Sequence, residues 1–510
     1  MVRFTPMAPH GRAPDSVFAD SHLVGRARVR NRNRNCNRQS TRHTIRRTTV
    51  PSFQLTSRAE AWPRFGRLRL RLRLRLGARA RARRTSTSTN VRGIAWVVFV
   101  IALSFSFCSS AELFKKYGKA VQVGPNPSAV VAADLNDDGL PEIITADTGA
   151  MSDPRQERPA NDEVSVLVAA GNLEYVAEPR LRTDFAPYSV VVGNVDALKA
   201  PDIVVGCFMA THHNDLWLFR NIGDNLFESA SFRAPYETLP YKRMLDGDQR
   251  PVFTVPGITS IALADFNGDG YRDVVATGWC SDTLVYFPGV PDKYFGDPRL
   301  IPAAEGPRDV RAADLDGDGK LDLAVALYSS NEVGIWKGNG DGTFAPAARF
   351  SSRGRLPNKV QVADVNRDGK PDVVVSHGYS DDSVVIFYGE GSFSFSTSQE
   401  IVLGPDRNAL EHEIRDLVAA DLNGDKKPDI AAACFASKQV AVLINESPGS
   451  AIPQTFRRET YAFENGRPRA LCTADLNKDG GTDLLVALWD QNAVAFLLGP
   501  TPQNESPAKR

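Results

Sequence analysis

The sequence has little cysteine and histidine, and neither residue is spaced for metal or redox chemistry. Six cysteines and seven histidines occur in 510 residues, with no CxxC, CxxxH or HExxH pattern. Zinc sites and dithiol centres usually show such spacings. A phosphate loop and a nucleophile elbow are also absent, which removes two further enzyme signatures. Enzymes that assemble a site from distant segments are not excluded.

The first 92 residues lack lysine and contain only three acidic residues, against 23 arginines. The net charge of this head is about +20, whereas residues 93–510 carry 38 basic and 57 acidic residues. The head has no sustained apolar period, and Arg67–Leu76 alternates Arg with Leu. We therefore expect residues 1–92 to be disordered, or to result from a start codon assigned too far upstream. We expect no nucleic-acid partner, because the remaining chain is acidic.

Long apolar runs are scarce as well. The exception is Ile94–Cys108, which follows Arg92 and precedes Ser109-Ser110-Ala111. This pattern is typical of a secretory signal, so we predict a signal peptide in residues 93–111. The alternative is a signal anchor, although the run is short for a membrane span. The expected location is secreted, periplasmic or on the cell surface, with membrane contact only through an uncleaved anchor.

An acidic motif, Asp-x-Asn/Asp-x-Asp-Gly-x-x-Asp/Glu, is abundant. Its seven copies begin at Asp134, Asn194, Asp265, Asp314, Asp364, Asp421 and Asp475, with a period of 49 to 71 residues. A period near fifty with strand-like flanks indicates a repeat array. In the fourth repeat we predict four short strands at Val310–Leu315, Leu323–Leu327, Val333–Lys337 and Phe344–Phe350. Such a meander is the blade of a β-propeller.

The seventh repeat ends after its third strand, at Leu498. The segment Leu113–Val123 precedes the first repeat and resembles the missing fourth strand. Pairing of the two ends would remove a free sheet edge. We therefore predict an all-β fold, a seven-bladed β-propeller of four-stranded antiparallel blades in residues 112–500, closed by an N-terminal strand and followed by a polar tail at 501–510. A linear solenoid is the alternative.

Six loops have the residues that a calcium ion requires. Side-chain oxygens at positions 1, 3 and 5 and a carboxylate at position 9 can wrap a hard cation, while Gly at position 6 lets the backbone turn back. The predicted ligands are Asp134, Asn136, Asp138 and Glu142; Asp265, Asn267, Asp269 and Asp273; Asp314, Asp316, Asp318 and Asp322; Asp364, Asn366, Asp368 and Asp372; Asp421, Asn423, Asp425 and Asp429; and Asp475, Asn477, Asp479 and Asp483. Repeat two, at Asn194, lacks the central carboxylate and is predicted to be empty. In repeat six Lys426 replaces the glycine at position 6.

The alternative is that these loops are Asx-rich turns that need no ion. Six copies in register favour a cation, because clustered carboxylates repel one another. Oxygen-only ligands and their number favour Ca²⁺ over zinc or magnesium. We expect five to six structural calcium sites.

The loops, with Gly338-Asn339-Gly340-Asp341-Gly342-Thr343-Phe344 in the fourth repeat, resemble the FG-GAP/VCBS repeats of integrin-α-like propellers. The resemblance implies a seven-bladed propeller with calcium in the first hairpin of most blades. It implies no single function, since the scaffold serves adhesion, lectin and enzyme proteins.

A second set of residues is predicted on the face opposite the acidic loops. Six residues before the first acid come Tyr188, Thr259, Arg308, Asn358, Arg415 and Arg469, and six after the last acid come Phe208, Trp279, Tyr328, Phe435 and Trp489. In register, Arg and aromatic residues surround one mouth of the central channel, where they would bind a sugar acid, an acidic glycan or a peptide carboxylate. The candidate ligand-binding residues are Arg308, Arg415, Arg469, Tyr188, Trp279, Tyr328 and Trp489. The alternative is that the aromatics pack between blades and the arginines pair with rim acids.

Two long polar segments, Ala150–Glu163 and Ala234–Gly257, are predicted on the same face. Long loops on a rigid scaffold often carry function. We favour a secreted or surface calcium-binding β-propeller that acts as a monomeric ligand-binding or adhesion module for an extracellular protein or glycan. The alternative is an extracytoplasmic polysaccharide hydrolase or lyase, whose candidate residues are Asp246, Asp248, His212, His213 and His377.

Cysteine pairing is a separate question. Cys207, Cys280, Cys434 and Cys472 lie in or beside predicted strands, where we expect small buried apolar side chains. A disulfide between Cys434 and Cys472 is the alternative.

Overall fold

A computed structural model describes the repeat region of the chain. The described residues are 112–149, 162–183, 186–196, 200–208, 215–223, 225–235, 244–245, 251–253, 257–291, 293–378, 382–404 and 413–502. The Arg-rich head, the predicted signal segment, His212-His213 and Asp246 and Asp248 lie outside these ranges. Among the described residues, no helix has both the length and the apolarity needed to cross a membrane.

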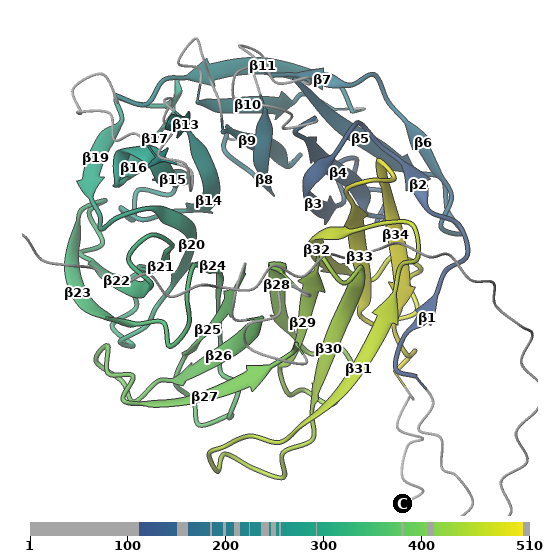
Figure 1. Cartoon of the computed structure of the whole chain (residues 1–510). Coiled ribbons are helices and arrows are strands. Elements are labelled where there is room, and N and C mark those ends of the chain that lie inside the picture. The colour runs from purple at the N-terminus through teal and green to yellow at the C-terminus, as the bar shows by residue number, and fades with distance from the viewer. Residues whose placement is uncertain are drawn as a thin grey trace, which may run out of the picture. The chain divides into compact units, whose positions relative to one another are not determined.

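Seven antiparallel sheets stand in a ring, and each sheet arises from one repeat (Figure 1). The first three blades are β3 (Pro127–Ala133), β4 (Glu142–Asp147), β5 (Glu163–Ala169), β6 (Tyr175–Ala177) and β7 (Leu181–Arg182); β8 (Pro187–Gly193), β9 (Asp202–Cys207), β10 (Leu216–Asn221) and β11 (Phe227–Phe232); and β14 (Ile258–Ala264), β15 (Asp273–Gly278), β16 (Thr283–Phe287) and β19 (Arg299–Pro302). The predicted seven-bladed β-propeller is confirmed, and the linear solenoid is wrong.

The last four blades repeat this order with fewer irregularities. They are β20 (Pro307–Ala313), β21 (Asp322–Leu327), β22 (Glu332–Gly338) and β23 (Phe344–Ser351); β24 (Pro357–Ala363), β25 (Asp372–His377), β26 (Ser383–Tyr388) and β27 (Thr397–Val402); β28 (Ile414–Ala420), β29 (Asp429–Cys434), β30 (Gln439–Asn445) and β31 (Phe456–Ala462); and β32 (Pro468–Ala474), β33 (Asp483–Leu488) and β34 (Ala493–Leu498). Two small hairpins, β12 (Met244–Leu245) with β13 (Pro251–Phe253) and β17 (Gly289–Val290) with β18 (Tyr294–Phe295), lie outside the blades.

The N-terminal segment closes the ring. β1 (Lys115–Lys116) and β2 (Val121–Gln122) both pair antiparallel with β34, so the seventh blade takes its outer edge from the start of the domain (Figure 1). The expected closure is confirmed, but the predicted continuous strand Leu113–Val123 is wrong. The chain leaves the sheet at Gly118 and returns to it at Val121.

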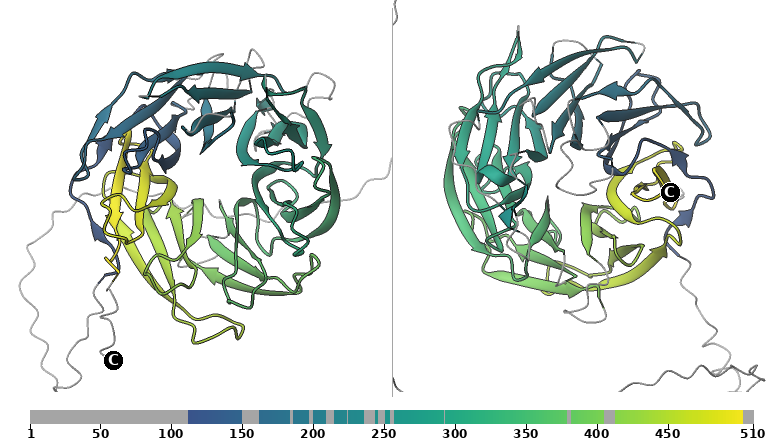
Figure 2. Two further views of the ribbon diagram at one scale, coloured as in Figure 1. Left: turned by 180° about the vertical axis from the view of Figure 1, so that it is seen from behind. Right: turned by 45° about the horizontal axis from the view of Figure 1, so that its top comes forward.

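The second strand of every blade is buried along its whole length, as in β4, β21 and β33. Neighbouring blades cover both of its faces, and one core cluster joins Val374 and Ile386 of the fifth blade to Leu417 and Ala432 of the sixth. Burial on both faces explains why these strands are continuous apolar runs and not alternating ones. Figure 2 shows the ring from behind and tilted, with the inner strands gathered around the axis.

Each of the seven inner strands contains an irregularity near its start. The register with the second strand shifts between Pro127 and Ala129 in β3, between Pro307 and Asp309 in β20, and at the matching place in β8, β14, β24, β28 and β32. A β-bulge leaves one residue out of the ladder and re-aims its side chain. The seven bulges therefore set which side chains reach the end of the channel.

Candidate functional sites

The loops of the six repeats other than repeat two are turns built around the carboxylate at position 1. In repeat four, Asp314 accepts backbone hydrogen bonds from Gly317 at 2.8 Å and from Gly319 at 2.9 Å. The backbone is left-handed at both of these positions, with φ of 80° and 83°. The same two positions are left-handed in repeats one, three, five, six and seven. The left-handed residue at position 4 was not predicted from the sequence, although the glycines at this position in repeats three, four and six were a signal for it.

Repeat six forms the same turn although it lacks the expected glycine. Lys426 adopts φ of 66° and donates its backbone N–H to Asp421 at 2.7 Å, as the glycines do in the other loops. A side chain at such a φ costs roughly 1 kcal/mol relative to glycine. The two hydrogen bonds that Asp421 accepts from Gly424 and Lys426 hold the turn against this cost.

The acid at position 9 is fully buried in all seven repeats, including repeat two. In repeat five, one oxygen of Asp372 accepts the N–H of Val365 at 2.8 Å, and the other accepts the N–H of Gly389 at 2.8 Å. Burial raises the pKa of Asp372 and of Asp429 to about 6. This carboxylate thus joins the loop to the end of the third strand, whether or not the loop has the full motif.

The remaining oxygens fit a hard cation. In repeat four, carboxylate oxygens of Asp314, Asp316 and Asp322 lie within 4.8 Å of one another. Each carboxylate has about four acceptor sites, so the backbone hydrogen bonds leave capacity for an ion. The donor set of the six predicted loops contains only oxygen, which suits calcium. The residues therefore fit the predicted ion, although the same contacts also make each loop an Asx-type turn.

Repeats two and four place a cationic side chain beside the loop. Arg220, near the end of β10, donates to Asp196 and also to Glu228 at 3.0 Å. Lys337 occupies the matching place on β22 and contacts Asp316, and Asp318 at 2.7 Å. The pKa of Arg220 is raised by its hydrogen bond to Asp196, and that of Lys337 by its hydrogen bond to Asp316. In repeat two, Arg220 supplies a positive charge where the motif is incomplete.

At the other end of the inner strands, the bulged residues converge with aromatic residues from the ends of the second strands. Arg308 donates to the Tyr188 hydroxyl, and Arg469 donates to the same oxygen at 2.5 Å. These three side chains come from the fourth, second and seventh blades, and all are buried. Arg415 joins them from the sixth blade and pairs with Glu413. The structure brings together all seven of the predicted ligand-binding residues around one cavity.

Aromatic rings form the walls of this cavity, which has a volume of about 280 Å³. The Arg308 guanidinium lies 4.7 Å from the Trp279 ring centroid, and Trp279 stacks on Phe208 at 5.3 Å. Tyr328 and Trp489 complete the walls with Phe435. We call this set of residues the channel mouth: Tyr188, Phe208, Trp279, Arg308, Tyr328, Arg415, Phe435, Arg467, Arg469 and Trp489.

Charge at the channel mouth perturbs two of its titratable groups. Burial alone would raise the pKa of the Tyr188 hydroxyl, but Arg308, Arg469, Arg415 and Lys359 together outweigh it and lower the pKa to about 7. Burial also lowers the pKa of Arg469, against the attraction of Tyr188. Positive charge is therefore in excess here.

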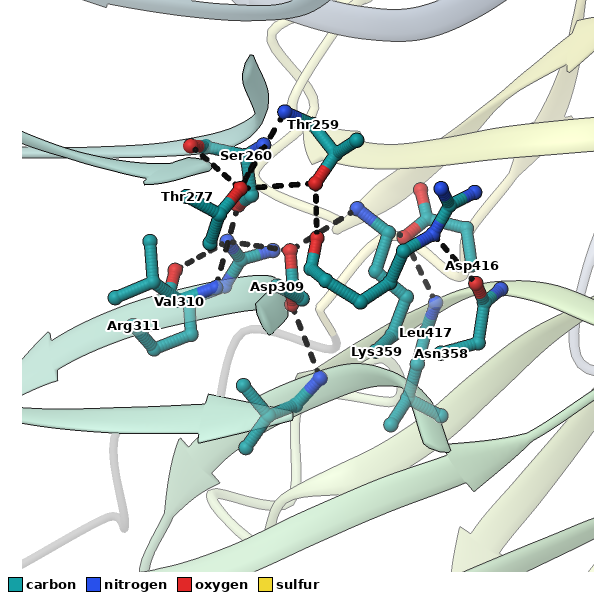
Figure 3. A network of polar contacts seen from close by, with 12 residues as sticks. Thr259, Ser260, Thr277, Asp309, Val310, Arg311, Asn358, Lys359, Asp416 and Leu417 are labelled. Carbon is teal, nitrogen blue, oxygen red and sulfur yellow. Dashed lines mark hydrogen bonds and ion pairs between the residues drawn. The ribbon is translucent and has the colours of Figure 1, made fainter. Parts of the chain in front are cut away.

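The sequence analysis missed Arg467, which lies 4.4 Å over the Phe435 ring and pairs with Asp490. It also missed a charged network deeper in the channel. The buried Asp309 contacts Lys359 at 3.3 Å and Arg311 at 3.5 Å, and Lys359 reaches Asp416 of the next blade at 3.6 Å (Figure 3). Asp309 also accepts the backbone N–H of Val360 at 3.0 Å. These contacts join the inner strands of the fourth, fifth and sixth blades.

Two residues of the predicted ring have other roles. Thr259 donates to the carbonyl of Arg308 at 2.7 Å, and Asn358 accepts from the Arg308 side chain at 3.2 Å. Both residues therefore hold Arg308 in position. His377, an enzyme candidate, is fully buried with its Nδ1 3.3 Å from the Ser383 hydroxyl. Cys434 and Cys472 are free thiols, so their disulfide is wrong.

Comparisons with known proteins agree with the architecture. An FG-GAP-like repeat family model matches residues 265–325, 314–375, 364–432 and 421–486. No curated protein matches the sequence. Two similar solved structures are crystal structures of BBS1N in complex with ARL6DN, one soaked with lead and one with mercury. Each is 13% identical, with a TM-score of 0.51, over 77% of this chain and 99% of that chain.

At this identity the solved structures support the fold alone, while the family match rests on the acidic loops of the third to seventh repeats. All seven repeats form blades of one closed ring. The chain is an FG-GAP-repeat protein whose repeats build a seven-bladed β-propeller.

Proposed function

We propose that the protein is an exported calcium-binding β-propeller that acts as a ligand-binding or adhesion module. The observation that carries the proposal is the recurrence of one turn geometry, with oxygen donors in register, in six of seven blades. Bound calcium would neutralise the clustered carboxylates of each loop and cross-link the first hairpin of the blade. The chain's own residues supply the preformed turn.

Export is supported by the apolar segment Ile94–Cys108 and its flanks. A protein ligand is supported in general terms by the BBS1N propeller, which is in complex with another protein. The cationic and aromatic channel mouth supports ligand binding at the end of the ring away from the acidic loops. The enzyme alternative gains no support, since four of its five candidate residues lie outside the described ranges and His377 is buried.

The proposal is tested by counting calcium in the full-length protein by atomic emission after equilibration and desalting. We expect five or six ions per chain. Asp316→Ala should lower the count by one, while Asp196→Ala, the change at the same loop position in repeat two, should leave it unchanged. A count of zero would reject the calcium role.

Export is tested separately by fractionating cells that express the full chain. We expect the propeller outside the cytosol, and we expect deletion of residues 93–111 to retain it inside. Cytosolic protein from the intact chain would contradict the export part of the proposal.

A further inference from the structure

The channel mouth contains more positive charge than its own residues neutralise. Arg308 and Arg469 are 9% and 5% exposed, and neither forms an ion pair with a described residue. Their shared polar partner is the hydroxyl of Tyr188. Buried charges are normally paired or hydrogen-bonded, because burial removes the water that would solvate them. Below the pKa of the Tyr188 hydroxyl, which is about 7, the two adjacent guanidinium groups share one neutral partner and are therefore under-neutralised.

The fold holds these guanidinium groups in place. Both arginines occupy the bulged position near the start of an inner strand. Arg308 is further fixed by Asn358, whose amide in turn donates to the carbonyls of Ile414 and Arg415 at 2.9 and 3.0 Å. Arg415 already has a partner, Glu413. The donors are thus preorganised by neighbouring blades, which lowers the ordering cost of binding.

From these contacts we infer that the channel mouth is a binding site for a carboxylate carried on an apolar body. The carboxylate would take the free donors of Arg308 and Arg469, which present the planar geometry that carboxylates match. The apolar body would lie against Trp279, Tyr328 and Trp489. This inference deepens the proposed function, on which it rests only for the premise that the propeller binds a ligand.

The lining disfavours a sugar as the ligand body. A sugar ring presents many hydroxyl groups that need both donors and acceptors. Among the described residues, the side chains around this cavity are aromatic rings, guanidinium groups and the hydroxyls of Tyr188 and Tyr328, with no carboxylate or amide. A ligand with one anionic group and an apolar surface matches this lining better. Both a free carboxylic acid and the C-terminal carboxylate of a peptide have this chemistry.

The size of the cavity agrees with a ligand group of this kind. Its volume of about 280 Å³ lies near the lower limit of about 300 Å³ for small-molecule sites. A second cavity of about 270 Å³ continues into the channel and shares Tyr188, Arg308, Arg415 and Arg469 with the first. The arginines therefore lie between an aromatic chamber and a second one that is lined by both charged and apolar side chains.

The test is a calorimetric titration of the full-length protein with phenylacetate, and with phenylacetamide as the neutral match. We expect phenylacetate to bind at least tenfold more tightly than the amide. Arg469→Met should weaken phenylacetate at least tenfold, whereas Arg349→Met, the same change on the exposed face of β23, should have no effect. Equal affinity for acid and amide overturns the inference.

Tyr188→Phe keeps the test decisive if the arginine variant fails to fold. Loss of the hydroxyl frees donors on both guanidinium groups, so we expect phenylacetate to bind severalfold more tightly. A purely structural cluster would bind nothing in either protein. Absence of binding in both the parent and a folded Tyr188→Phe variant, checked by near-ultraviolet circular dichroism, overturns the inference.

Further arms identify the ligand source and its body. If N-acetyl-Ala-Phe binds more tightly than phenylacetate, and its C-terminal amide does not bind, the inference is supported and the carboxylate is that of a peptide C-terminus. Tighter binding of phenylacetate supports it with a free acid. If glucuronate binds more tightly than phenylacetate and N-acetyl-Ala-Phe, the inference that the ligand has an apolar body is overturned. Calcium counts separate this result from the proposed function: bound calcium without carboxylate binding rejects only the inference, and the converse rejects only the calcium role.

Discussion

In six of the seven blades, the end where the first and second strands are joined presents nearly the same loop. At the opposite end of the same strands, the residue at the bulged position differs from blade to blade, and three of the seven are arginines. The loop carboxylates are mostly bonded to the backbone of their own repeat. Arg308 and Arg469 of the channel mouth are bonded across blades.

The difference separates two kinds of information in one repeat. A feature present in every blade, such as the buried acid at position 9, stabilises the blade itself. A feature that differs between blades acts only when the ring brings the blades together. Repeat two illustrates the boundary, since it keeps the buried Asp202 but replaces part of the acidic motif with an Arg220–Asp196 pair.

The largest expected effect is removal of calcium, which acts on the loop end alone. At about 10 mM calcium and dissociation constants of about 10⁻⁴–10⁻³ M, each site would contribute roughly 1.4–2.7 kcal/mol. Five or six sites sum to about 10 kcal/mol, or a fall in Tm of about 10 °C with chelator. Scanning calorimetry measures this shift. An unchanged Tm would show that the loops hold their turns without an ion.

Replacement of the position 9 acid sharpens the comparison within the loop end. Asp202→Ala leaves the buried N–H groups of Val195 and Asn221 without acceptors, so we expect a loss of about 2–4 kcal/mol. Because repeat two is predicted to bind no ion, the loss should be equal with and without calcium. Urea unfolding checks this, with Asp202→Asn as a milder control. A loss seen only with calcium would assign Asp202 to a metal site.

The metal-free protein should become less stable as pH rises from about 4 to 6. Burial raises the pKa of Asp147, Asp372 and Asp429 to about 6, from 3.8. In this window the folded state retains protons that the unfolded state has released, so stability falls with rising pH and levels off above pH 6. Urea unfolding in chelator should show a change of about 2 kcal/mol or more. Asp147→Asn should flatten the slope, and a rising slope would contradict the expectation.

At the channel mouth, affinity for phenylacetate should fall as pH rises from 6 to 8. The pKa of Tyr188 is about 7, in the field of Arg308, Arg469, Arg415 and Lys359 from four other blades. Above it, a phenolate would neutralise the donors that the carboxylate needs. We expect a loss of about tenfold, or about 1.4 kcal/mol, that disappears in Tyr188→Phe. An affinity for phenylacetate that does not change with pH in the parent protein would show that ionisation of Tyr188 does not affect the binding site.

The smallest expected effect tests the loop turn itself. Lys426→Gly should stabilise the protein by up to about 1 kcal/mol, because glycine adopts the left-handed φ at no steric cost. Gly369→Lys makes the converse change at the matching position of repeat five and should destabilise by a similar amount. Both are measured by urea unfolding. Destabilisation of the protein by Lys426→Gly would mean that the side chain of Lys426 makes a compensating contact.

The ring and its loops were predictable because they repeat. Seven copies in register fixed the strand order, and the missing fourth strand of the last repeat indicated closure. The same register placed Tyr188, Arg308 and Arg469 at one end of the channel. Their role as ligand-binding residues stays a prediction, as does the role of the loop acids as calcium ligands.

Contacts between particular side chains of different repeats were not predictable. The network of Asp309, Lys359 and Asp416 has one member in each of three blades, so no local pattern links them. The left-handed position 4 was missed because Asp137, Arg367 and Lys478 occupy it beside three glycines. The closing strand was predicted as continuous because its apolar residues gave no sign of the break near Gly118.

Closure by β1 and β2 has a consequence for how the protein is made. Within the propeller, the strand synthesised last, β34, lies between β33 and the segment synthesised first, β1 and β2. At about 5–20 residues per second, the first strand waits roughly 20–80 s for its partner. During that interval both ends of the growing array are open edges, able to pair with another nascent chain. Synthesis is therefore the period in which this protein is most exposed to misassembly, and a chaperone that shields Lys115–Gln122 would act at the most vulnerable point.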